Sequence, residues 1–362
     1  MKSVPFLFLL MLFCGCSVTG EQTEPLCFER FFNWTPPNDE ACAERYFRAG
    51  VTDVCVANRK QYDLAVKYNM TPFYGCFTPA GPHGQVVTPE EEKNLKYISG
   101  SDLPAGVRGA ERQKLLAQRQ REKNHRFGGP AVNPFDTLRN TIPCFISDKE
   151  LKLSKAKIDK LLKKAPAGSA GICFDFLGYT NFRGCYCKNC LTLLQKFLRE
   201  KKLKDTAENR SIFYRDQLVN YYNAMADYVK SKRPGYKVLA HFYPDFQFEP
   251  FYGNRTKVDF AGQTVAWYFK YPLAEVAANT RRVLAEANRY QPHSAVIPFL
   301  GLNTDTRTAL GFKTPEELDL ELKTILAAGA RSLMICCGRT VSEPGYYEVF
   351  CKYSTRKAVK KK

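Results

Sequence analysis

The sequence predicts a single α/β domain folded as a (β/α)8 barrel. Short runs rich in β-branched and aromatic residues alternate along the chain with amphipathic helical stretches, which is the pattern of parallel strands joined by crossover helices. Eight such runs follow one another, and this favours a closed barrel over an open doubly wound sheet. About 340 of the 362 residues remain after the apolar N-terminal segment, the usual length of one barrel.

The expected elements follow directly from this pattern. The predicted strands cover residues 28–33, 51–57, 71–77, 171–178, 236–243, 264–269, 294–300 and 331–337. The predicted helices cover residues 39–48, 60–68, 148–164, 190–202, 207–232, 272–290 and 315–328, and three begin after cap-forming residues, namely Asn38, Ser147 and Thr314. No Gly-rich phosphate loop follows a strand, so a dinucleotide-binding fold is not expected. The barrel domain is expected to span residues 24–357.

Two connections are irregular, and irregular loops at the C-terminal ends of barrel strands are where function is usually found. The first is a long insertion at residues 78–141, after the third strand, which contains a very basic helical piece at 108–123. The second covers residues 244–262, after the fifth strand. It is rich in aromatic residues and carries Asp245 and Glu249.

The N-terminal segment has the order of an export signal. Lys2 precedes an apolar stretch at residues 4–13, which is too short to span a bilayer, and Gly15 directly precedes Cys16. Residues 1–16 therefore resemble a bacterial lipoprotein signal, in which Cys16 is lipidated and anchors the chain to the membrane. We expect a lipoprotein of the bacterial cell envelope, with ordinary secretion as the alternative.

The chain is strongly basic, with a formal net charge of +18 and a pI near 9.3. Such a field attracts polyanions. Export argues against nucleic acid as the partner, and the basic residues are spread over several groups. A sulfated or uronic-acid polysaccharide, or an anionic membrane surface, fits an exported basic protein better. The alternative is that the charges only solvate helix faces.

Three cysteines within six residues, Cys185, Cys187 and Cys190, predict a metal site. Disulfides are the usual state of many cysteines in an exported chain, and they remain the alternative. Neighbouring members of so close a group bridge each other poorly, however, whereas their thiolates suit one tetrahedral zinc ion. Cys144, which follows the basic insertion, is the best fourth ligand. The expected cofactor is a structural zinc ion.

The other cysteines predict packing rather than chemistry. Four of them lie within apolar predicted strands and are expected to be packed thiols, namely Cys55, Cys76, Cys173 and Cys336. Cys27 and Cys351 lie near the two ends of the barrel sequence, and a bridge between them is a further expectation.

The run Cys185-Tyr-Cys-Lys-Asn-Cys-Leu-Thr-Leu-Leu-Gln resembles a segment of the glycoside hydrolase family 42 β-galactosidases, in which a Cys-Tyr-Cys-x-x-Cys loop opens the helix after barrel strand four. In that family a cysteine some forty residues upstream completes a structural zinc site, and Cys144 lies 41 residues before Cys185. Similar loops occur in uncharacterised glycoside-hydrolase-like barrels in which an Asp ends the preceding strand. The motif resemblance covers residues 144–201, and the barrel pattern extends it more weakly to the whole chain.

The same resemblance implies two catalytic glutamates that this chain lacks. The family's acid/base is the Glu of an Asn-Glu pair about nine residues before the first Cys of the loop, where this chain has Asp175-Phe176. The family's nucleophile is a Glu ending strand seven, but residues 297–303 hold no carboxylate and the next is Asp305. The family's mechanism therefore does not carry over, and two hypotheses remain.

In the first hypothesis Asp175 is the working carboxylate of a glycoside hydrolase. It ends an apolar strand, and several other glycosidase families, such as α-galactosidases and α-fucosidases, place an Asp nucleophile there. Hydrolysis needs a second carboxyl group, and the candidates are Asp245, Glu249 and Glu343, with Asp305 a weaker choice. A structural Asp bonded to Arg or backbone is the alternative reading of Asp175.

In the second hypothesis the barrel binds glycan without catalysis. Aromatic rings at strand ends would stack on sugar faces, and an Arg would pair with carboxylate or sulfate. The candidate binding residues are Trp34, Tyr179, Tyr243, Trp267, Tyr268 and Arg339. His241 would hydrogen-bond a hydroxyl or tune an acid, with a packed core histidine as the alternative.

Overall fold

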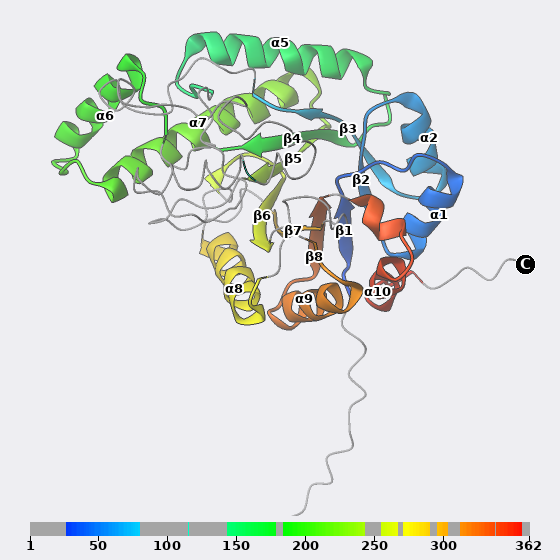
Figure 1. Ribbon diagram of the computed structural model, residues 1–362. Helices are drawn as coiled ribbons and strands as arrows, with labels where there is room; N and C mark the ends of the chain where they lie inside the picture. Colours follow the sequence, from blue (N-terminus) through cyan, green and yellow to red (C-terminus); the bar gives the residue numbers. More distant parts are fainter. Residues whose placement is uncertain are drawn as a thin grey trace, which may run out of the picture.

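The computed structural model describes residues 27–79, 115, 143–178, 184–242, 255–266, 271–289, 295–302, 312–336 and 338–356. Eight parallel strands close a barrel in sequence order, from β1 to β8, and β1 pairs with β8 to complete it. Helices surround the strands, as Figure 1 shows. The predicted (β/α)8 barrel is therefore confirmed.

The strands agree with the predicted positions, with one exception. They are β1 (Arg30–Asn33), β2 (Asp53–Val56), β3 (Thr71–Phe77), β4 (Gly171–Leu177), β5 (Lys237–Phe242), β6 (Phe260–Ala266), β7 (Ala295–Gly301) and β8 (Ser332–Cys336). The sixth strand starts at Phe260, four residues before the predicted start, so that prediction was wrong. Gly262 weakens the sequence signal, but the barrel needs a glycine there because a Cβ atom would lie 2.5 Å from the Met334 sulfur.

The helices follow the predicted pattern closely. They are α1 (Glu40–Arg48), α2 (Arg59–Lys67), α5 (Asp148–Lys164), α6 (Lys188–Glu200), α7 (Ala207–Lys232), α8 (Leu273–Arg289), α9 (Pro315–Ala327) and α10 (Tyr346–Lys352), with a 3-10 helix η3 (Gly338–Ser342). Ser147 and Thr314 cap α5 and α9 as predicted. The cap of α1 is Asp39 and not Asn38, because the Asp39 side chain accepts from the Cys42 amide. The short helix α10 was not predicted.

The core has two layers, one inside the barrel and one between the strands and the helices. The interior layer consists of Phe32, Cys55, Phe73, Cys173, Leu239, Ile297, Phe299 and Met334. Cys55 and Cys173 are buried there, as predicted. Cys76 is exposed at the end of β3, so its expected packing was wrong, and Cys336 is half-buried. Cys351 is a free thiol 3.8 Å from the Arg48 carbonyl oxygen, so it does not bridge Cys27.

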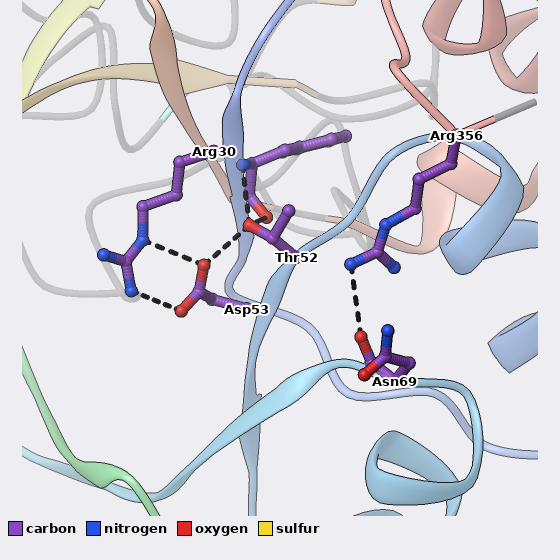
Figure 2. A network of polar contacts seen from close by, with 6 residues as sticks. Arg30, Thr52, Asp53, Asn69 and Arg356 are labelled. Atoms are coloured by element: carbon purple, nitrogen blue, oxygen red, sulfur yellow. Dashed lines mark hydrogen bonds and ion pairs between the residues drawn. The ribbon is translucent and has the colours of Figure 1, made fainter.

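A polar network closes the N-terminal end of the barrel (Figure 2). The guanidinium of Arg30 donates to both carboxylate oxygens of Asp53, at 2.9 and 2.5 Å, and lies over the Phe260 ring. Arg356, after α10, donates to the carbonyl oxygens of Val51 and Asn69, which ties the C-terminal segment to β2 and β3. This end of a barrel serves stability, so function is expected at the opposite end.

Several expectations fall outside the described part of the chain. The segment with Cys16 and the insertion at 78–141, apart from Thr78, Pro79 and Leu115, are among them. In the residues that are described, no helix combines the length and the apolar character needed to cross a membrane.

Candidate functional site

The C-terminal ends of six strands bring one group of chemically distinctive side chains together. Because all eight strands are parallel, their C-terminal ends meet at the same end of the barrel. The group consists of Trp34 just after β1, Cys76 on β3, Asp175 on β4, His241 on β5, Thr264 on β6 and Phe299 on β7. We call it the strand-end cluster.

Asp175, His241 and Thr264 form a chain of polar contacts across three neighbouring strands. The Asp175 Oδ1 atom lies 3.3 Å from Nδ1 of His241, and Nε2 of His241 lies 3.3 Å from Oγ1 of Thr264. The Asp175 side chain is 19% exposed, whereas that of His241 is 2% exposed. Solvent therefore reaches the carboxylate and not the imidazole.

Aromatic rings fix the imidazole in place. The ring of Phe299 stacks on His241 with centroids 3.7 Å apart and planes at 13°. Trp34 meets the same imidazole edge-on, with centroids 6.1 Å apart. β7, which carries no carboxylate, thus presents an apolar ring to His241.

Cys76 lies on the other side of Asp175. The residue as a whole is exposed, but its thiol is surrounded by the strand ends. Desolvation of the thiol is the largest cause that raises the pKa of Cys76, and the charge of Asp175 is the next. The Asp175 carboxylate and the Trp34 indole are both close enough to act on the Cys76 thiol, the first raising its pKa and the second lowering it. Asp175 is therefore approached by side chains from both neighbouring strands.

The junction of β1 and β8 holds Trp34 and Arg339. Gly338 accepts on its carbonyl from the Asn33 amide and the Tyr46 hydroxyl, and a Cβ atom at Gly338 would lie 1.6 Å from Asn33 Oδ1. Arg339, the next residue, is exposed, and its positive charge acts on Tyr46. Both predicted binding residues therefore lie at the C-terminal end of the barrel.

Glu343 lies apart from this cluster in its contacts. It follows η3, its backbone bonds to Thr340 and Tyr347, and its charge acts on Tyr346. Among the residues with described coordinates, no contact joins it to Asp175. The remaining predicted site residues lie outside the described residues, namely Asp245, Glu249, Asp305, Tyr179, Tyr243, Trp267 and Tyr268.

The four predicted cysteines form a second site. It is near Asp175 in the sequence, but no described contact joins it to the strand-end cluster. The sulfur atoms of Cys144, Cys185, Cys187 and Cys190 all lie within 4.8 Å of one another. Cys144 Sγ lies 3.5 Å from that of Cys190 and 3.9 Å from that of Cys187. Sulfur ligands about 2.3 Å from a tetrahedral ion are about 3.8 Å apart, whereas a disulfide needs about 2 Å. The spacing therefore suits a metal.

The local electrostatics also suit thiolate ligands. The backbone N–H groups of Ile146 and Cys187 act to lower the pKa of Cys144 and Cys185 respectively, and α6 begins immediately after Cys187. A helix N-terminus and amide donors both stabilise thiolates. Hydrogen bonding to Cys144 raises the pKa of the Cys185 and Cys190 thiols. Four thiolates at this spacing would repel one another, so they require a cation between them.

The loop before α6 is built to hold these sulfurs. Gly184 has φ of +128°, and a Cβ atom there would lie 2.4 Å from the ring of Tyr214. The Tyr214 hydroxyl donates to the Cys185 carbonyl at 2.6 Å. The cluster joins the segment before α5 to the loop after β4. It therefore lies close in sequence to Asp175, which is on β4.

Thr264, Phe299 and Cys76 were not predicted as site residues. Thr264 was missed because the sixth strand was placed four residues too late, which put Thr264 at its start and not near its end. Alternation from Phe260 would have shown Thr264 facing inward. Cys76 was interpreted as core because an apolar strand surrounds it, and nothing in the sequence pairs Phe299 with His241.

Comparison with known proteins supports the fold. A beta-galactosidase from the psychrophilic Marinomonas ef1 aligns with 84% of this chain at 9% identity and a TM-score of 0.50. A beta-galactosidase from Rahnella sp. R3 aligns with 87% at 11% identity and a TM-score of 0.50. This chain covers 53% and 50% of those two chains, about half of their length.

An alpha-L-fucosidase from Paenibacillus thiaminolyticus aligns with 90% of the chain at 15% identity and a TM-score of 0.49, over 48% of its own length. No family model matches the sequence, and no curated protein matches it. The barrel is thus of the kind found in glycoside hydrolases, and at these identities the likeness establishes the fold alone.

Proposed function

We propose that this protein is a glycoside hydrolase acting on an oligo- or polysaccharide, with Asp175 as nucleophile or base. The observation that carries the proposal is the position of Asp175, a partly exposed carboxylate at the C-terminal end of β4 that contacts His241. A carboxylate is costly at the end of an apolar strand unless the site uses it. The barrel shared with two beta-galactosidases makes a saccharide the first substrate to test.

The second carboxyl group is proposed from position. Asp245 follows β5 by three residues, and β5 is the neighbour of β4. Two carboxyl groups about 5 Å apart would give a retaining reaction, and a wider separation would give an inverting one. Glu343 is the second choice, because its described contacts are with Tyr346 and its own turn and none of them reaches Asp175.

Substrate binding is proposed for Trp34 and Arg339, together with Tyr179, Tyr243 and Trp267. Trp34 is half-buried beside His241, so one part of its ring can face a sugar. Arg339 is exposed at the end of β8 and can pair with a carboxylate or sulfate group.

A non-catalytic carbohydrate-binding barrel is the second candidate. The observation that favours it is β7, which carries no carboxylate and presents the ring of Phe299 to His241. In that case Asp175 would only orient His241 and accept hydrogen bonds from a sugar.

A structural zinc ion is proposed at the four-cysteine site, with Cys144, Cys185, Cys187 and Cys190 as its ligands. Four sulfur ligands leave no open position, so the ion would supply no step of the reaction. It would fix the loop between β4 and α6, and therefore the end of β4.

An anionic polymer is proposed as the substrate of this basic chain, whose net charge is +18. The outer helix α5 supports this proposal (Figure 1). Its exposed lysines recur at helical spacing, and in the described part of the chain none of these forms an ion pair: Lys149, Lys152, Lys160, Lys163 and Lys164. Export and a lipid anchor at Cys16 are proposed from the N-terminal segment.

The test is a screen of the purified chain, without residues 1–16, against neutral, uronic-acid and sulfated glycans. Release of reducing ends supports hydrolysis, and binding by calorimetry without release supports the second candidate. If the chain neither cleaves nor binds any glycan, the proposal fails.

A further inference from the structure

Thr264 completes a chain of contacts that begins at the working carboxylate. We propose that Thr264 is a positioning residue whose hydroxyl, by donating to Nε2 of His241, commits the Nδ1 proton of His241 to Asp175. The inference deepens the proposed function and rests on Asp175 being its working carboxylate. The geometry comprises two contacts of 3.3 Å, one on each imidazole nitrogen.

The roles of donor and acceptor follow from the groups present. An ionised carboxylate only accepts, so Nδ1 of His241 must carry the proton that it shares with Asp175. In the neutral imidazole the other nitrogen is then an acceptor, and the Thr264 hydroxyl is able to donate to it. Within the described residues, this is the only hydrogen bond of the Thr264 side chain.

Burial makes the Thr264 contact consequential. His241 is 2% exposed, and Phe299 covers one face of its ring at 3.7 Å. An imidazole nitrogen that loses the Thr264 hydroxyl in such a place has little access to water, and a buried polar atom with a weakened hydrogen bond destabilises its conformation. Removing the Thr264 hydroxyl is therefore expected to change the tautomer or the orientation of His241.

The orientation of His241 matters because it decides what Asp175 can do. The contact with Nδ1 of His241 fixes the direction of the Asp175 carboxylate. A charged carboxylate serves as nucleophile or base, and not as the proton donor. The donor must then come from another residue, which agrees with a search for the acid among the loop carboxylates.

The experiment measures the tautomer of His241 directly. The chain has four histidines, so 15N-histidine labelling gives few signals, and His241→Gln identifies the one of interest. The variants are Thr264→Val, which removes the hydroxyl at nearly constant volume, and Thr264→Ser, which keeps it. Thr280→Val is the matched control, because Thr280 is fully buried and, among the described residues, its hydroxyl bonds only to the Val276 carbonyl of its own helix.

The expected spectrum has the His241 proton on Nδ1 in the wild-type chain, in Thr264→Ser and in Thr280→Val. In Thr264→Val the Nε2 resonance moves or splits, while circular dichroism reports an unchanged fold. The proposal is overturned if the wild-type proton resides on Nε2, or if Thr264→Val leaves the His241 signals unchanged.

Kinetics on a glycan found by the screen then test the consequence. We expect Thr264→Val to lower kcat on the order of a hundredfold with little change in KM, because a small misplacement of the reacting group has effects of that size. Thr264→Ser should restore most of it. If the spectra agree with expectation but no glycan is cleaved, hydrolysis is wrong while the positioning role of Thr264 stands.

Discussion

Asp175 and His241 are joined across neighbouring strands, with Oδ1 of the carboxylate 3.3 Å from Nδ1 of the imidazole. This pair holds the one described carboxylate of the strand-end cluster where solvent can reach it. In a barrel of this kind the C-terminal strand ends carry the chemistry, so the pair is the natural target for mutation.

The first prediction concerns Asp175→Asn. If Asp175 is the nucleophile or base, the amide lowers turnover of any cleaved glycan by about 10²- to 10⁴-fold, the usual contribution of such a group. Glycan binding and thermal stability should change little. Reducing-end release and calorimetry on the same preparations measure the two effects.

The matched control for that change is Asp63→Asn. Asp63 carries an exposed ion pair with Arg59 on α2, where its side chain is 54% exposed. The same chemical change there should leave turnover at the wild-type rate. Equal turnover by Asp175→Asn and the wild type would show that Asp175 has no part in catalysis.

The second prediction concerns the four-cysteine site. Protein purified under reducing conditions should contain about one zinc ion per chain, and Cys190→Ser should lose it. Loss of the ion should lower Tm on the order of 5–10 °C, because several kcal/mol of loop anchoring disappear. Chelation of the wild-type chain should produce the same shift.

Cys351→Ser is the control for the metal site. Cys351 is a free thiol on α10 that contacts the Arg48 carbonyl oxygen and has no contact with the four cysteines. It should keep the zinc content and Tm of the wild type. A wild-type chain that contains no metal and is indifferent to a chelator would contradict the zinc proposal.

The sequence predicted most of this architecture because periodicity and spacing are local properties. Seven strands and three of the four cysteines follow from patterns within short windows, and the spacing of residues 144–190 predicts the whole cluster. The strand-end cluster is different. Phe299 meets His241 because β7 and β5 flank β6 in the closed barrel and both side chains point inward, and no local pattern records that relation.

The shifted sixth strand had the largest consequence for the site. Gly262 and Gln263 are weak strand formers, yet at Gly262 a Cβ atom would lie 2.5 Å from the Met334 sulfur, which is a tertiary contact. Placing the strand start at Thr264 hid the alternation that turns its hydroxyl inward. The approach of Met334 from β8, two strands away in the barrel, is a tertiary contact that strand propensity does not record.

The third prediction concerns the polar network in Figure 2. Arg30→Met leaves the Asp53 carboxylate, whose side chain is 3% exposed, without its cationic partner. We expect a loss of about 2–4 kcal/mol in the free energy of unfolding. Urea denaturation measures it. Arg59→Met, which breaks an exposed pair, should cost about 0.5 kcal/mol or less, and an equal cost for both variants would contradict the argument.

The fourth prediction concerns the buried pair between Lys313 and Glu321, which anchors the segment before α9. The Lys313 ammonium donates to Glu321 at 2.7 Å and to the Gly301 carbonyl at 3.1 Å, and both side chains are almost fully buried. Burial lowers the pKa of Lys313 and raises the pKa of Glu321, while the attraction between the two charges opposes both shifts. Lys313→Met removes that attraction and should cost about 3–5 kcal/mol at neutral pH.

The cost of Lys313→Met should depend on pH in one direction. Without Lys313, the pKa of Glu321 in the folded chain rises further above its value in the unfolded chain, because the ammonium that lowered it is gone. The folded state then binds a proton more tightly than the unfolded state, so its stability is greatest below the unfolded pKa of Glu321 and falls as the pH rises through the folded one. Urea unfolding should therefore give a smaller difference from the wild type at pH 5 than at pH 8. Lys313→Met combined with Glu321→Leu should remove this pH dependence, and a difference that grows towards pH 5 would contradict the assignment.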